Sequence, residues 1–162
     1  MKMILAAGRN GEIGNKGGLL ASIPSDMKYF RQQTTGKTVI MGRATLESFP
    51  GGKPLPKRRN IVLSRTLEAG DGFEVCRDTE ELLQLVKPEE DDDLMVIGGG
   101  SIYQQLRPLC SEALVTEIDA QFEADTFIKP FYNDPEWELT SRSEPVEENG
   151  FTYTFAVYRR KG

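Results

Sequence analysis

One carboxylate is a candidate for proton chemistry because of the pattern around it. In the stretch Ile23–Phe30 (IPSDMKYF), apolar residues recur at spacings of four and three, which predicts one apolar helix face. Pro24 and Ser25 are typical of a helix start, where Ser25 can cap free N–H groups. Asp26 lies close to the apolar face, beside Met27. Its carboxylate is therefore either favoured there by the helix dipole alone or kept in an apolar pocket for use.

The other residue types narrow that chemistry. The chain contains no histidine and only two cysteines, Cys76 and Cys110. A zinc site, a disulfide framework and a Ser-His or Cys-His nucleophile pair are therefore poor hypotheses, and no metal is expected. Any proton transfer must come from a carboxylate, a tyrosine, a lysine or water.

A second candidate site follows an apolar run. Leu94–Ile97 is fully apolar, as a central parallel strand would be, and three glycines at 98–100 lead into a helix expected over 101–106. Free N–H groups and the helix dipole at such a junction favour a phosphate. The glycines do not match the dinucleotide fingerprint G-x-G-x-x-G, and a tight turn explains them equally well.

Charge is distributed unevenly along the chain. The whole chain has a net charge of −5, yet the segment 43–65 holds six basic residues and one acid, Glu47. A local basic zone in an acidic protein favours a small anionic ligand over nucleic acid, which would need a broader basic face. A solvated basic loop is an equally good interpretation of this segment alone.

Size and composition predict one ordinary domain. The 162 residues, 38% of them hydrophobic and 28% charged, suit a single domain over residues 1–162. No apolar run approaches the length of a membrane span, so no membrane partner is expected. The apolar start, Met1–Gly8, is too short for a signal peptide and fits a buried strand better. The cytoplasm is the expected location.

The order of elements indicates the fold class. Strands are expected over 2–7, 38–41, 60–64, 73–76, 94–97, 113–118, 136–142 and 151–159. Helices are expected from Asp26 to about Thr34, over 42–49, after Asp78, and over 101–106. Five glycines in 8–18 predict a long permissive loop, of the kind that covers sites. Early alternation and late strands predict a three-layer α/β domain around a mostly parallel sheet.

Several stretches together resemble one family, dihydrofolate reductase. They occur in the family's order and span nearly the whole chain: Ile23–Phe30, Val39–Ser48, Pro54–Arg65, Val96–Tyr103 and Asp125–Phe127. The resemblance implies a mainly parallel eight-stranded sheet with an antiparallel edge strand and about four helices. It also implies reduction of 7,8-dihydrofolate to tetrahydrofolate by NADPH, in a protein expected to be a monomer.

The resemblance gives Asp26 a catalytic role. It resembles the single carboxylate at the pteridine site, where it would hydrogen-bond the ring's 2-amino and N3 groups, with Thr116 supporting it. Burial should raise its pKa, and those ring donors would oppose the rise. A nearby water can then protonate N5 while C6 receives a hydride. Arg58 resembles the partner of the folate α-carboxylate. The implied apolar wall consists of Leu5, Ala6, Met27, Phe30, Leu55 and Ile97.

The resemblance also implies an NADPH site. Arg43 and Thr45 lie where the family binds phosphates at a helix start, and Ser64 and Arg65 where the 2′-phosphate would lie. Gly98-Gly99 is where the family has a cis peptide bond. The full implied set is Ala7, Ile13, Gly42, Arg43, Ala44, Thr45, Leu63, Ser64, Arg65, Gly98, Gly99, Gly100, Ser101, Ile102, Tyr103 and Thr126.

Two departures from the family pattern concern the covering loop and the loop after the second helix. Leu20 and Ala21 stand where Pro and Trp are usual, which predicts a roomier, wetter pocket or a filling residue from elsewhere. The added pair Gly51-Gly52 lengthens the second loop, so Leu55 could be shifted.

Two other functions fit parts of the pattern. One is the related NADPH-dependent pyrimidine reductase of riboflavin synthesis, which has no need for Asp26 and Arg58 together. The other is a non-catalytic protein that binds NADPH or folate and has lost turnover through Ala21.

Overall fold

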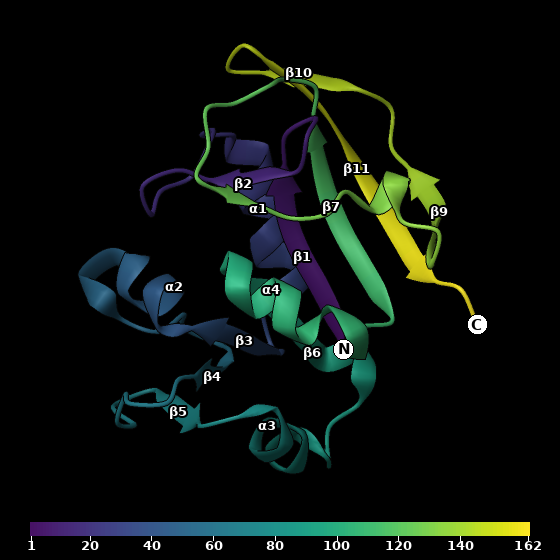
Figure 1. The fold of residues 1–162 in the computed structure, drawn as a ribbon. Helices are drawn as coiled ribbons and strands as arrows, with labels where there is room; N and C mark the ends of the chain where they lie inside the picture. The colour runs from purple at the N-terminus through teal and green to yellow at the C-terminus, as the bar shows by residue number, and fades with distance from the viewer.

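The computed structural model describes all residues, 1–162, and its centre is one large sheet (Figure 1). The strand order is β10-β11-β7-β1-β6-β3-β4-β5, and β9 also pairs with β11. All pairings from β7 through β5 are parallel, whereas β11 is antiparallel to each of its three neighbours. The expected mainly parallel sheet with an antiparallel edge is confirmed, and β10, which the sequence does not predict, brings the eight expected strands to nine.

The strands have the following bounds. In the main sheet they are β1 Lys2–Ala7, β3 Thr38–Gly42, β4 Arg59–Leu63, β5 Phe73–Cys76, β6 Leu94–Gly98, β7 Glu112–Ile118, β9 Trp137–Arg142, β10 Val146–Glu148 and β11 Phe151–Arg160. Two short strands, β2 Glu12–Gly14 and β8 Thr126–Phe127, form a separate pair. The central strands β3 and β6 are buried at every position, as their apolar runs predict.

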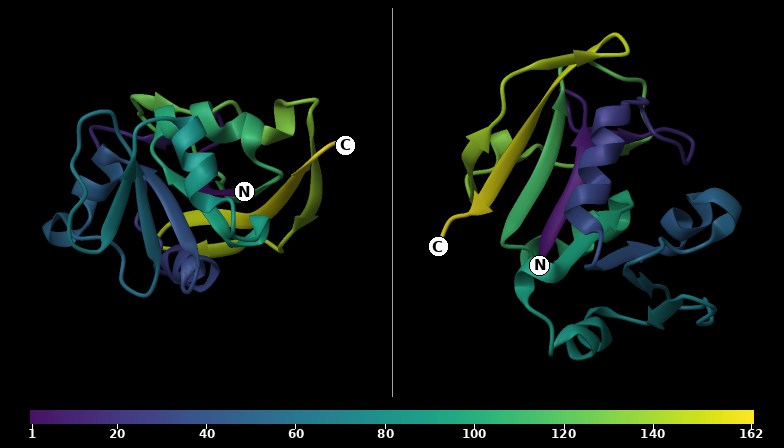
Figure 2. Two further views of the ribbon diagram at one scale, coloured as in Figure 1. Left: turned by 90° about the horizontal axis from the view of Figure 1, so that it is seen from below. Right: turned by 180° about the vertical axis from the view of Figure 1, so that it is seen from behind.

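Four helices connect and cover the sheet. They are α1 Pro24–Thr34, α2 Arg43–Ser48, α3 Thr79–Val86 and α4 Gly100–Leu106, and four short 3-10 turns are interspersed. In Figure 1 α4 lies in front of β1, and in the rear view of Figure 2 α1 lies on the opposite side of the same strand. No helix is long and apolar enough to cross a membrane.

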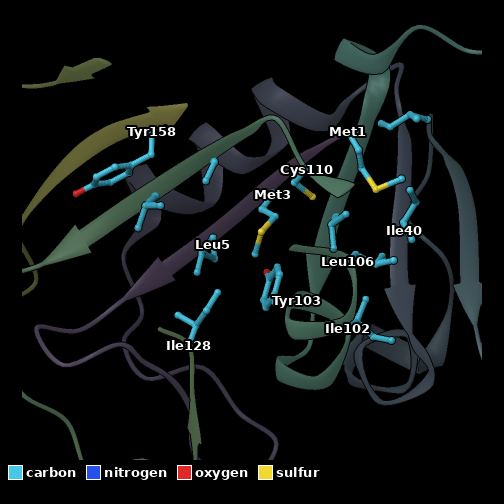
Figure 3. Packing of buried hydrophobic residues seen from close by; sticks show 14 of the residues in the cluster. Met1, Met3, Leu5, Ile40, Ile102, Tyr103, Leu106, Cys110, Ile128 and Tyr158 are labelled. Atoms are coloured by element: carbon cyan, nitrogen blue, oxygen red, sulfur yellow. The ribbon is translucent and has the colours of Figure 1, made fainter. Parts of the chain in front are cut away.

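The two faces of β1 and β7 bury different sets of side chains. Leu5 and Val115 pack with α4 in the larger core cluster, which Figure 3 shows around Met3, Tyr103 and Leu106. The alternate residues face α1, where Ala6 is paired in register with Thr116. Successive strand side chains point to opposite faces, so a site beside Ala6 and Thr116 is separated by the sheet from one beside Leu5 and Val115.

Two sequence predictions about local structure were wrong. The glycine-rich segment 8–18 is not a loop throughout, because Glu12–Gly14 forms β2 and pairs with β8. Ser25 does not cap α1 with its side chain; its backbone N–H and its hydroxyl both donate to the Glu148 carboxylate, each at 2.8 Å. By contrast, Asp78 caps α3 as expected, accepting from the Glu81 N–H at 2.8 Å.

Candidate active site

Asp26 lies in the first turn of α1, facing the sheet. The Thr116 hydroxyl of β7 donates to its Oδ1 at 2.5 Å, and the carboxylate forms no ion pair. Burial raises the pKa of Asp26 above its ordinary value, while the Thr116 hydrogen bond opposes the rise. The apolar pocket interpretation is therefore the better one, because a merely dipole-stabilised surface carboxylate would be solvated.

Apolar side chains form a wall beside this carboxylate. Ile97 is buried in the cluster against which Phe30 and Leu55 pack. Leu55 is held by two hydrogen bonds to the side chain of Asn60, at 3.0 and 2.9 Å, so the longer preceding loop leaves it fixed against this cluster. Met27, also expected in the wall, is 48% exposed at the rim.

Leu5 is a correction to the predicted wall. Its side chain packs in the cluster on the α4 side of the sheet, because it alternates with Ala6 along β1. Leu5 therefore offers only its backbone to the Asp26 side.

Arg58 has hydrogen-bonding capacity left over. Its Nη1 and Nη2 donate to the Pro56 carbonyl and the Thr35 hydroxyl, each at 3.3 Å, while its buried Nε has no partner. Burial, with Arg31 nearby, lowers the pKa of Arg58 below its ordinary value. Two cations close together with an unpaired buried N–H favour an anionic ligand.

The expected cofactor residues converge at the carboxyl edge of the parallel strands. β3 ends at Gly42, beside Leu63 at the end of β4, and β6 ends at Gly98. A Cβ on Gly42 would lie 2.8 Å from Ile102, and one on Gly100 would lie 2.5 Å from Thr126. Only glycine permits these close approaches, and ligands of open α/β sheets bind at this edge.

The turns at this edge suit anionic groups. The Ser64 hydroxyl oxygen accepts from the N–H groups of Thr66 and Leu67, at 3.4 and 3.1 Å, which leaves its own proton free to donate. Arg65 is exposed, and Arg43 forms an exposed ion pair with Glu47 at 3.0 Å. Ala44 and Ser101 are exposed at the first turns of α2 and α4, with Thr45 half-buried near Gly99. The residues present therefore fit a dinucleotide with a 2′-phosphate.

Two further observations concern the end of β6, in the middle of the carboxyl edge of the sheet. The Gly98–Gly99 peptide bond is cis, as the resemblance implies. The Tyr103 hydroxyl donates to the Ile4 carbonyl at 2.7 Å, which ties α4 to β1. Ile13 lies near Gly100 and Ala7 is buried at the end of β1, so both expected residues border this edge.

Comparison with known proteins gives a consistent result. The sequence profile of the family described as Dihydrofolate reductase matches residues 1–160. The dihydrofolate reductase of Haemophilus influenzae is 38% identical over 162 residues, which cover 98% of this chain and 98% of that protein. That of Mycobacterium leprae is 37% identical over 162 residues, covering 98% and 96%. The chain belongs to the dihydrofolate reductase family.

A solved structure agrees with this membership. Dihydrofolate reductase from Enterococcus faecalis complexed with NADP(H) and RAB-propyl is similar with a TM-score of 0.83 and 31% identity, covering 99% of this chain and 96% of that one. The protein is an oxidoreductase that reduces dihydrofolate to tetrahydrofolate with NADPH. The comparisons favour this activity over the related pyrimidine reductase.

The departure from the family pattern at Ala21 lies beside an aromatic cluster. Ala21 packs against the small buried cluster of Ile23, Ile118 and Tyr153, against which the rings of Phe122, Phe151 and Phe155 also pack. Phe155 also stacks on Tyr29, with ring centroids 4.2 Å apart. These rings are candidates for the filling residue that the sequence predicts.

Sequence reasoning missed several residues that hold the site. Glu148 and Asn149, from the hairpin between β10 and β11, contact Ser25 and the Ser22 carbonyl at the start of α1. The guanidinium of Arg77 donates to the Ser64 carbonyl at 3.1 Å and steadies the turn after β4. Partners 123 residues apart, as Ser25 and Glu148 are, leave no local sequence signal.

Proposed function

We propose that Asp26 polarises the pteridine of dihydrofolate through hydrogen bonds to its 2-amino and N3 groups. The observation that carries this proposal is the half-buried carboxylate with one internal hydrogen bond, from Thr116, and no cation. The remaining lone pairs of Asp26 can accept from two ring donors at once. Such charge-assisted bonds are stronger in a water-poor site than in solvent.

The same carboxylate supports protonation at N5. Bound NADPH supplies the hydride that pteridine C6 accepts. Asp26 holds negative charge close to the ring, which makes N5 more basic, and a water can then deliver the proton. The absence of histidine is consistent with delivery through water. Ala6, Phe30, Leu55 and Ile97 exclude bulk solvent from the ring, with Met27 at the rim.

Charged side chains are proposed to bind the glutamate α-carboxylate of the folate and the 2′-phosphate of NADPH. Arg58, whose buried Nε is unpaired, binds the α-carboxylate of the folate glutamate, and the nearby Arg31 adds positive charge there. Ser64, Arg65 and Arg43 hold the 2′-phosphate of NADPH, for which Arg43 exchanges its exposed partner Glu47. Gly98, Gly99 and Gly100 let the backbone approach the pyrophosphate.

The decisive experiment replaces the carboxylate with a neutral isostere. In Asp26→Asn, NADPH binding should persist while kcat for dihydrofolate near neutral pH falls roughly 10²–10⁴-fold, the range for a positioned acid–base group. Turnover is followed by the loss of NADPH absorbance, and NADPH affinity by fluorescence titration. Parent-like turnover in this variant would remove the proposed role.

The matched control is Glu112→Gln, on the same strand as Thr116. Glu112 is paired with Lys2 and Arg159 at the far end of β7, so this variant should keep kcat within about twofold. Tight NADPH binding by the parent protein without any turnover would instead favour the non-catalytic alternative and implicate Ala21.

The proposal also includes the oligomeric state and the cellular location of the protein. The protein is expected to be a monomer, as the family resemblance implies, and sedimentation of the purified protein would test this. Free, buried Cys76 and Cys110 are consistent with a reducing compartment such as the cytoplasm.

A further inference from the structure

A cavity of about 550 Å³ lies on the face of the sheet opposite to Asp26. It is bounded by the ends of β1, β7 and β11 and by the segment 128–132, which crosses in front of β7 in Figure 1. We call it the far-side cavity. Its volume falls in the range of about 300–1,000 Å³ typical of small-molecule sites. None of the charged groups proposed for the reductase site lines it, and Ala7 is its one residue that is also expected to border NADPH.

The floor of the far-side cavity is apolar. Leu5 and Val115 reach it from the sheet, and Ile128 and Phe131 from the crossing segment. Figure 3 shows Leu5 and Ile128 close together at one end of the core cluster. This floor suits the body of a small aromatic molecule rather than a fully polar ligand.

Glu117, one of the two carboxylates that line the cavity, is already bound within the chain. Glu117 accepts at Oε1 from Arg142 Nε and Nη2, at 3.0 and 2.8 Å, and at Oε2 from the Tyr158 hydroxyl at 2.5 Å. Both oxygens of Glu117 are therefore hydrogen-bonded within the chain, and the side chain of Arg142 is still 42% exposed. A cationic ligand would therefore have to displace Arg142 or Tyr158 from Glu117.

The unused groups of the cavity are donors. Arg142 Nη1 makes no hydrogen bond within the chain, and neither does the hydroxyl of Thr154 on the adjacent strand. At the rim Arg9 uses Nε and Nη2 on Asp119 and leaves its Nη1 free, although both of these side chains are largely exposed. Donors of this kind bind a carboxylate, and guanidinium groups match its planar geometry.

We propose that the far-side cavity binds a small aromatic monocarboxylate. Its ring lies on Leu5 and Val115, and its carboxylate accepts from Arg142 Nη1 and the Thr154 hydroxyl. The proposal does not depend on the role given to Asp26, because the two sites are on opposite faces of the sheet.

The experiment must keep such a ligand off the Asp26 side, where Arg58 also attracts carboxylates. Isotopically labelled protein is saturated with NADP⁺ and folate, and 3-phenylpropionate is titrated while methyl NMR signals are followed. Saturable shifts should concentrate at Leu5, Val115 and Ile128. Shifts confined to Ile97 and Met27, or no saturable shift, would overturn the proposal.

Two changes, one in the ligand and one in the protein, test whether the carboxylate of the ligand contributes to binding. The neutral isostere 3-phenylpropanamide should bind about tenfold more weakly, the loss expected for one charge-assisted hydrogen bond. Arg142→Gln should weaken the acid by a similar factor and leave the amide unaffected. Equal affinity for the acid and the amide in the parent protein would contradict the proposed class of ligand.

Filling the cavity tests its location. Thr154→Trp should abolish the shifts at Leu5 and Val115, because the indole occupies the ring's place. The matched control Arg159→Gln changes a 64% exposed arginine of the same strand, outside the cavity, and should keep parent affinity. Undiminished binding in a folded Thr154→Trp protein would overturn the proposal.

Discussion

Thr116 and Glu117 are neighbours on β7, yet they belong to two very different polar centres. Thr116 faces α1 and donates one hydrogen bond to Asp26, a carboxylate without a cation. Glu117 faces the other way and is itself bound by Arg142 and by the hydroxyl of Tyr158. One centre thus joins β7 to helix α1 through Thr116, and the other begins at the next residue of β7, on the opposite face of the sheet.

The difference separates a carboxylate kept for a ligand from one used by the fold. Burial raises the pKa of Asp26 because no internal cation compensates for lost water. Glu117 has its charge matched and raises the pKa of Arg142 in turn. The unpaired centre costs stability and leaves acceptors for substrate, whereas the paired centre joins β7, β9 and β11.

The largest effect on stability is expected from breaking the paired centre. Glu117→Ala leaves the buried Tyr158 hydroxyl and Arg142 without their acceptor, and should lower the free energy of unfolding by about 2–3 kcal/mol. Urea denaturation measures this change. Asp119→Ala, which breaks the exposed pair with Arg9, is the control and should cost less than about 1 kcal/mol. Equal costs would mean that burial of the Glu117 centre has no energetic weight.

A smaller effect is expected from the hydrogen bond that Asp26 does receive. Thr116→Val keeps shape but removes the donor, so the pKa of Asp26 should rise further while stability falls by about 1 kcal/mol. The pKa is followed through the Asp26 carboxyl signal in ¹³C NMR. The control is Thr116→Ser, which keeps a hydroxyl donor and should therefore keep the parent pKa of Asp26. If Thr116→Val left the pKa of Asp26 unchanged, the hydrogen bond from Thr116 would have no effect on the carboxylate.

The smallest effect concerns the pH dependence of stability. The folded-state pKa of Asp26 lies above its ordinary value of 3.8, so its protonated form is favoured by folding. Its contribution is therefore fully favourable below the unfolded pKa and is lost as pH rises through the folded pKa. Asp26→Asn should melt above the parent at about pH 8, and this advantage should vanish near about pH 3. A variant less stable than the parent at about pH 8 would show that the carboxylate stabilises the fold.

Long apolar patterns predicted their elements well. The runs behind β1, β3 and β6 and the spaced apolar residues of α1 give elements within a residue or two of expectation. Short elements were missed, because β2 and β8 have three and two residues and carry no periodicity. Their pairing depends on segments more than 100 residues apart.

The candidate site was predicted unevenly for the same reason. Asp26, Arg58 and the glycines at 98–100 follow from motifs in the sequence; in the structure Asp26 lies in α1, Arg58 precedes β4, and the glycines begin at the end of β6. Leu5 was expected in the wall beside Asp26 but its side chain packs on the other face, because membership of a strand does not say which neighbour covers each side. Glu148 at the start of α1 has no motif at all.

The sequence by itself determined the family, the order of the longer strands and helices, and the residue types available for chemistry. The composition offers no histidine, and apolar periodicity predicted that Asp26 lies on a helix. Only the tertiary structure decided that Asp26 has no cationic partner while Glu117 is paired with Arg142. It also decided that a cavity lies on the face of the sheet opposite to Asp26. Those features depend on contacts between segments that are distant in the sequence. The free energy of such contacts depends on how the whole chain packs and cannot be read from a local pattern.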